Sequence, residues 1–150
     1  MRPRCTTHDP SGTGGDEPVV AGPSHAAAIV RASSPPAAGP ALVALLCDRS
    51  HQLLLALAVE GAPAAALPRV VDFVLGVAEP GGVRSIVLAI VRERLGSYLP
   101  RRDAEGLSGL APRCEAAGVD LLDVLLVGPR GWRSVYDLAA GPGGEDTGPP

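Results

Sequence analysis

Arginines gather in one short polar stretch of the sequence, just after a buried apolar run. Arg92 and Arg94 open the stretch, Arg101 and Arg102 close it, and Glu93 is its one acidic residue. Guanidinium groups bind phosphate or carboxylate through paired, charge-assisted hydrogen bonds. The sequence therefore predicts a candidate anion-binding loop formed by these four arginines. A solvated polar connection is the alternative, since charge on a loop needs no partner.

Histidine and cysteine are too sparse to predict a metal site. Cys47 and His51 form a C-x-x-x-H pair on a turn, but a zinc site takes about four ligands. His8 and His25 lie in a stretch rich in glycine and proline. The chain has an odd number of widely spaced cysteines, at Cys5, Cys47 and Cys114. This argues against a disulfide framework and for a reducing, cytoplasmic environment. We expect no cofactor.

Apolar runs and turn residues predict a buried hairpin followed by alternating helices and strands. The hairpin runs are rich in leucine and alanine and would equally suit a helix, so their length and the turn between them decide the prediction. The predicted order is ββαβαββ, with strands 41–47 and 52–60, helix 68–81, strand 85–91, helix 103–118, and strands 120–128 and 132–138. Pro112 is expected to kink the second helix. This order predicts an α/β fold with a mixed β-sheet and flanking helices.

Both ends of the sequence have a different composition from its middle. Residues 1–40 and 140–150 are rich in Gly, Pro, Ser and Thr, and the second stretch carries two acids and no base. Neither has enough apolar surface to offset the entropy lost on ordering. The predicted organisation is a disordered tail at 1–40, one domain at 41–139 and a disordered acidic tail at 140–150. A short helix at His25–Ala32 is the one qualification.

Composition excludes several functional classes. Hydrophobic residues make up 46% of the 150 residues, which is enough for a core. The net charge of −3 gives no strong field for nucleic acid or a membrane surface. No apolar run approaches the roughly 18 residues of a membrane span. All 13 basic residues are arginine, which indicates a GC-rich coding bias of bacterial type.

Several residues toward the C-terminus resemble the JAB/MPN (JAMM) domain of RadC-type proteins. In that family a helix ending in Gly-Ile leads into an acidic-Leu-Leu-Asp strand, then Val-Gly, a Gly-aromatic turn and Ser. The matching residues here are Gly118-Val119, Asp120 to Asp123, Val127-Gly128, Gly131-Trp132 and Ser134. The resemblance spans about 41–139 and implies a three-layer-like JAB/MPN sandwich. Its members are zinc metalloproteases or isopeptidases.

Most residues of that family's metal motif are absent from this sequence when the two are compared position by position. The motif positions hold Ile90 and Arg92 in place of two histidines, Glu93 in place of proline, and Pro100 in place of serine. Asp103 is the one retained position, and a helix N-cap explains an aspartate there equally well. Isoleucine has no lone pair and arginine stays protonated, so the zinc of the family is predicted lost.

The catalytic glutamate of the family would fall near Ala56, and the nearest carboxylate, Glu60, is out of register. The first hypothesis is therefore a non-catalytic RadC-like JAB-fold domain that binds an unknown protein partner, with no catalytic, cofactor-binding or metal residue. The second is an active metal-dependent hydrolase with unrecognised ligands. The third is a small nucleotide- or nucleic-acid-binding α/β domain that uses the loop from Arg92 to Arg102. A membrane partner is not expected.

Overall fold

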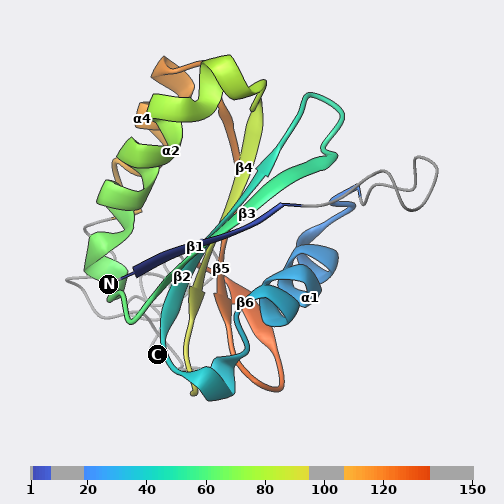
Figure 1. Ribbon diagram of the computed structural model, residues 1–150, viewed down its shortest axis with the longest axis vertical. Helices are drawn as coiled ribbons and strands as arrows, with labels where there is room; N and C mark the ends of the chain where they lie inside the picture. Colours follow the sequence, from blue (N-terminus) through green and yellow to red (C-terminus); the bar gives the residue numbers. More distant parts are fainter. Residues whose placement is uncertain (1, 8–18, 95–106, 136–150) are drawn as a thin grey trace, which may run out of the picture.

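A twisted mixed β-sheet forms the middle layer of the molecule (Figure 1). The structure is a computed structural model that describes residues 2–7, 19–94 and 107–135. The six strands lie in the order β1-β3-β2-β4-β5-β6, and only β4 and β5 are parallel neighbours. They are β1 (Arg2–Thr7), β2 (Ala41–Cys47), β3 (Leu53–Glu60), β4 (Ser85–Val91), β5 (Asp120–Val127) and β6 (Trp132–Ser134).

Strands β2 and β3 form the predicted hairpin because the turn between them is fixed by an aspartate. The Asp48 carboxylate accepts the N–H groups of Ser50 at 2.8 Å and Gln52 at 3.0 Å. Within the same turn His51 takes a left-handed conformation, with φ at 65°. These local bonds bring two apolar runs side by side, and all seven residues of β2 are buried. The helical alternative for these runs is therefore excluded.

Helices cover both faces of the sheet, and each face has its own core. α2 (Leu67–Gly81) and α4 (Leu110–Ala116) pack on the face that carries Leu42, Leu88 and Val124. α1 (Pro23–Ser33) packs on the other face (Figure 1). Short 3-10 turns, η2 (Pro36–Ala38) and η3 (Ala64–Ala66), lead into β2 and α2. The fold class is α/β with a mixed sheet, as predicted.

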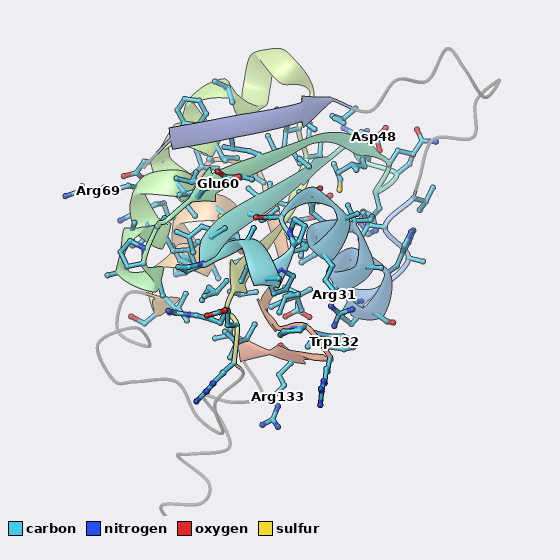
Figure 2. All side chains as sticks on the ribbon, turned by 60° about the horizontal axis from the view of Figure 1, so that its bottom comes forward. Arg31, Asp48, Glu60, Arg69, Trp132 and Arg133 are labelled. Atoms are coloured by element: carbon cyan, nitrogen blue, oxygen red, sulfur yellow. The ribbon has the colours of Figure 1, made fainter. Side chains whose placement is uncertain are left out.

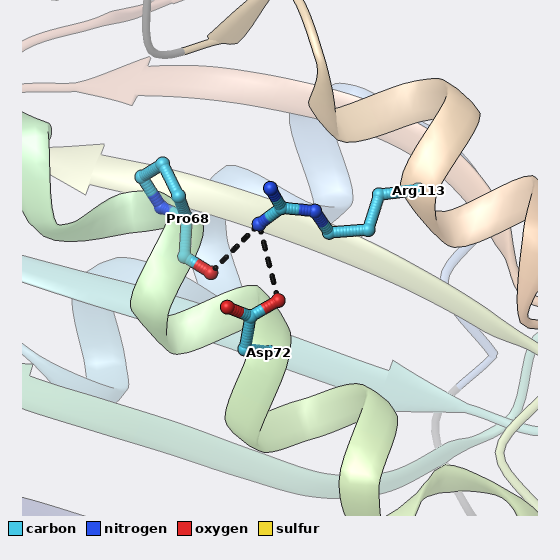
Figure 3. Close-up of polar contacts among 3 residues, drawn as sticks. All are labelled: Pro68, Asp72 and Arg113. Carbon is cyan, nitrogen blue, oxygen red and sulfur yellow. Dashed lines mark hydrogen bonds and ion pairs between the residues drawn. The ribbon is translucent and has the colours of Figure 1, made fainter.

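An arginine ties the two helices of the first face together (Figure 3). The guanidinium of Arg113 on α4 donates to the Asp72 carboxylate at 3.1 Å and to the Pro68 carbonyl at 3.4 Å, both on α2. Both charged side chains are about half exposed, so this ion pair contributes little stability in water. Its effect is to fix where α4 lies along α2.

Between Ala41 and Ser134 the described elements follow the order strand, strand, helix, strand, helix, strand, strand. β4 is buried on both faces, with Ile86, Leu88 and Ile90 in one core and Val87 and Ala89 in the other. Among the described residues no helix is long and apolar enough to cross a membrane.

The predicted disordered tail at 1–40 is wrong for much of its length. Ala26, Ala27 and Val30 of α1 are fully buried against the sheet. The strand β1 pairs with β3 along its whole length, from Arg2 opposite Glu60 to Thr7 opposite Leu55. The qualification made for a helix at His25–Ala32 was therefore the better indication. The tail at 140–150 lies outside the described residues.

The helices also differ from the predictions in detail. α4 begins at Leu110, so Pro112 lies in its first turn, where backbone N–H groups have no helical acceptor and no kink is required. The predicted start of a helix at Asp103 lies outside the described residues. Gly118 ends this segment as predicted, with φ at 77°. On α2, the apolar side chains of Phe73 and Val77 are 57% and 40% exposed.

Candidate binding surface at the carboxyl ends of β4 and β5

The parallel strands β4 and β5 end at the same edge of the sheet. Val91 pairs with Val127 in the last row, and the N–H of Arg92 donates to the Val127 carbonyl at 3.0 Å. The segment that leaves β4 and the turn that leaves β5 therefore start side by side. In open α/β sheets this carboxyl edge of the parallel strands is where ligands bind.

An open depression of about 650 Å³ lies between these two segments. Arg94 and Glu93 line it from the segment after β4, and Arg130 lines it from the turn after β5 together with Pro129 and Gly131. The Gly128 N–H donates to the Gly131 carbonyl at 2.9 Å and holds this turn closed. Two arginines from different parts of the sequence thus share one hollow.

Arginines from α1 and β6 extend this positive edge (Figure 2). The Arg31 Nε–H donates to the Gly128 carbonyl at 2.8 Å, which brings its guanidinium to the turn after β5. Arg133 lies on β6 opposite Leu126, and its side chain is exposed. Sequence reasoning missed Arg31, Arg130 and Arg133. The signal for Arg130 was its place in the turn two residues after a predicted strand.

Several of these guanidinium groups have no protein partner in the described part of the chain. The side chains of Arg94, Arg130 and Arg133 are exposed, and none of them makes a hydrogen bond or ion pair with another described residue. Glu93 is the one described carboxylate that lines the depression. The predicted loop members Arg101 and Arg102 lie outside the described residues.

The described positions assigned to the first histidine and to the catalytic glutamate of the family lie on opposite faces of the sheet. Ile90 is 1% exposed in the core under α2, whereas Ala56 is 4% exposed in the core under α1. Because successive strand residues point to opposite faces, side chains at these two positions lie on opposite sides of the sheet. Glu60 is in register with Val91 but two strands away, a separation of roughly 10 Å. Pro100 and Asp103 lie outside the described residues.

Cys47 and His51 at the hairpin turn do not belong to any group of three or more candidate metal ligands among the described residues. Burial, with a smaller effect of the Asp48 charge, raises the pKa of the Cys47 thiol to about 11. This thiol therefore stays protonated near neutral pH and is a poor ligand. Burial also raises the pKa of Cys114, which Arg113 partly opposes. No described group of three or more His, Cys, Asp or Glu side chains could hold a metal ion.

Two residues of the C-terminal resemblance meet at the junction of β5 and β6. The Ser134 hydroxyl donates to the Asp123 carboxylate at 2.7 Å, and the same oxygen accepts the Val124 N–H at 2.8 Å. Asp123 also borders a small hollow of about 190 Å³ beside His51 and the start of α1. The Ser134 hydroxyl is therefore a structural contact that joins β6 to β5.

No model of a known protein family matches this chain, and no curated protein is significantly similar to it. The resemblance to RadC-type JAB domains is therefore carried forward as a proposal.

Proposed function

We propose that this chain is a non-catalytic RadC-like JAB-fold domain that acts as a protein interaction module in the cytoplasm. The observation that carries the proposal is the placement of Ile90 and Ala56 in separate cores. Rebuilding the hydrolase there would require a zinc ligand at Ile90 and a catalytic glutamate at Ala56, which lie on opposite faces of a six-stranded sheet. A zinc-bound water near neutral pKa, which metalloprotease chemistry needs, has no support at these positions.

Two further observations support the proposal. The described elements between Ala41 and Ser134 occur in the order that the resemblance implies. Asp123 and Ser134, which the resemblance picks out separately in the sequence, are in direct contact. The unpaired arginines at the carboxyl edge of β4 and β5 then provide a surface for binding without catalysis.

A nucleotide- or nucleic-acid-binding domain is the second candidate. The exposed guanidinium groups of Arg94 and Arg130 favour it, because arginine forks bind phosphate well. The net charge of −3 weighs against it, since nucleic-acid-binding domains carry a clear excess of positive charge.

Zinc retention tests the proposal against an active hydrolase. Purified protein is incubated with excess zinc, desalted and analysed for metal; we expect far less than one equivalent, because the motif positions offer no lone pairs. The variant Asp103→Asn should behave in the same way. One bound equivalent in the natural chain, lost in Asp103→Asn, would show a retained metal site and contradict the proposal.

A further inference from the structure

The positive edge at the ends of β4 and β5 differs from the other arginine positions of the described chain. Arg113 forms an ion pair with Asp72, and Arg84 donates to the neighbouring Val83 carbonyl. Arg49 and Arg69 are exposed and stand on separate elements, a turn and a helix. At the carboxyl edge, by contrast, Arg94 and Arg130 line the same hollow.

Like charges at one hollow repel each other, and water screens this repulsion because both side chains are exposed. Among the described residues, Glu93 is the one carboxylate that lines the hollow, and it cannot satisfy two guanidinium forks, each of which presents five N–H donors. The surface therefore has spare donors that match an oxygen anion in charge and in planar geometry.

We infer that this edge binds an extended acidic segment of a partner protein, with its carboxylates on Arg94 and Arg130. The inference rests on the proposed function and names the chemistry of the partner. The net charge of −3 decides between partner classes, because the rest of the molecule repels a long polyphosphate but allows a short carboxylate-bearing peptide confined to the hollow. Arg31 and Arg133 flank the same edge and would hold the ends of such a segment.

The turn after β5 suits this role because it is rigid. Pro129 has a restricted φ, the Gly128–Gly131 bond closes the turn, and Arg31 ties the Gly128 carbonyl to α1. Arg130 is thus displayed from a fixed backbone, so less entropy is lost on binding than from a free loop. Trp132 follows directly and is the single tryptophan of the chain, so its fluorescence reports on this edge.

The test measures binding of a labelled oligoglutamate peptide by fluorescence anisotropy, with Trp132 emission as a second readout. We expect binding that weakens as salt is raised, because the contacts are between exposed charges. The double variant Arg94→Gln/Arg130→Gln should weaken binding about tenfold or more. The double variant Arg94→Lys/Arg130→Lys should bind with an affinity between those of the natural chain and the Gln double variant. Lysine keeps the positive charge but lacks the planar fork of donors.

The matched control is Arg49→Gln, which changes an exposed arginine at the opposite end of the sheet and should leave binding unchanged. Thermal melting of each variant checks that the fold is intact. The inference is overturned if the Gln double variant binds as tightly as the natural chain, or if no binding occurs at low salt. Tighter binding of an oligothymidylate of equal charge would overturn it in favour of nucleic acid. A bound equivalent of zinc in the metal analysis would contradict the proposed function but not this inference, because peptide binding can still be measured.

Discussion

A hydrogen bond between a carboxylate and a hydroxyl joins the last two described strands. In the sequence these two residues belong to separate pieces of the resemblance and show no connection. Asp123 lies in β5 and Ser134 in β6, and their 2.7 Å contact is within the range of charge-assisted hydrogen bonds. β6 is three residues long, so this side-chain bond adds to a short backbone ladder. The contact fixes β6, and with it the turn that displays Arg130.

Ser134→Ala should therefore destabilise the protein by about 1–2 kcal/mol, because the half-buried Asp123 carboxylate loses a donor. Urea unfolding followed by far-UV circular dichroism measures the change. Ser50→Ala is the matched control, since Ser50 is exposed in the β2–β3 turn and its N–H rather than its hydroxyl is bonded to Asp48. Equal stability of the two variants would show that the contact does not hold β6.

Some arginines of the positive edge could be predicted from the sequence, whereas others reach that edge only through the fold. Arg92 and Arg94 follow a long β-branched run, so their place after a strand was readable. Arg31 and Arg133 are distant in sequence and reach the same edge because α1 and β6 lie next to β5. Such long-range neighbours leave no local pattern, and sequence reasoning missed them for that reason.

Strands β2 to β5 and helix α2 were predictable because their signals are local. β4 is an uninterrupted apolar run, buried on both faces, and α2 repeats apolar residues at helical spacing between Pro68 and Gly81. α1 gave the opposite signal, since alanine, glycine, proline and serine dominate its surroundings. Its burial depends on the apolar sheet face that it meets, and three small side chains suffice for close packing there.

Helix α1 supplies a sharp test of this packing, because Ala27 is fully buried and the next residue, Ala28, is exposed. Ala27→Asp should destabilise the fold by several kcal/mol, since it places an unpaired charge against the sheet. Ala28→Asp introduces the same charge on the exposed side of the same helix. Its free energy of unfolding should stay within about 0.5 kcal/mol of that of the natural chain. Denaturant unfolding compares the two. If both variants behave alike, α1 does not cover the sheet and residues 1–40 are a tail after all.

Charge is unevenly distributed over the molecule, although the net value is small. Five described arginines mark one edge of the sheet, at Arg31, Arg92, Arg94, Arg130 and Arg133, while the chain as a whole carries −3. A local positive edge on an acidic molecule favours partners that are short and locally negative. The exposed apolar residues Phe73 and Val77 lie on α2, which packs on one face of the sheet rather than at its carboxyl edge.

The central claim is that this molecule binds an acidic partner segment at the carboxyl ends of β4 and β5. Backbone amide shifts of the isotope-labelled protein, titrated with oligoglutamate, test it most directly. We predict that the perturbed amides cluster at Arg92–Arg94 and Gly128–Gly131, with no change at Arg49 and Ser50 in the opposite turn. Perturbations centred on Phe73 and Val77 of α2, or spread without a centre, would contradict the claim.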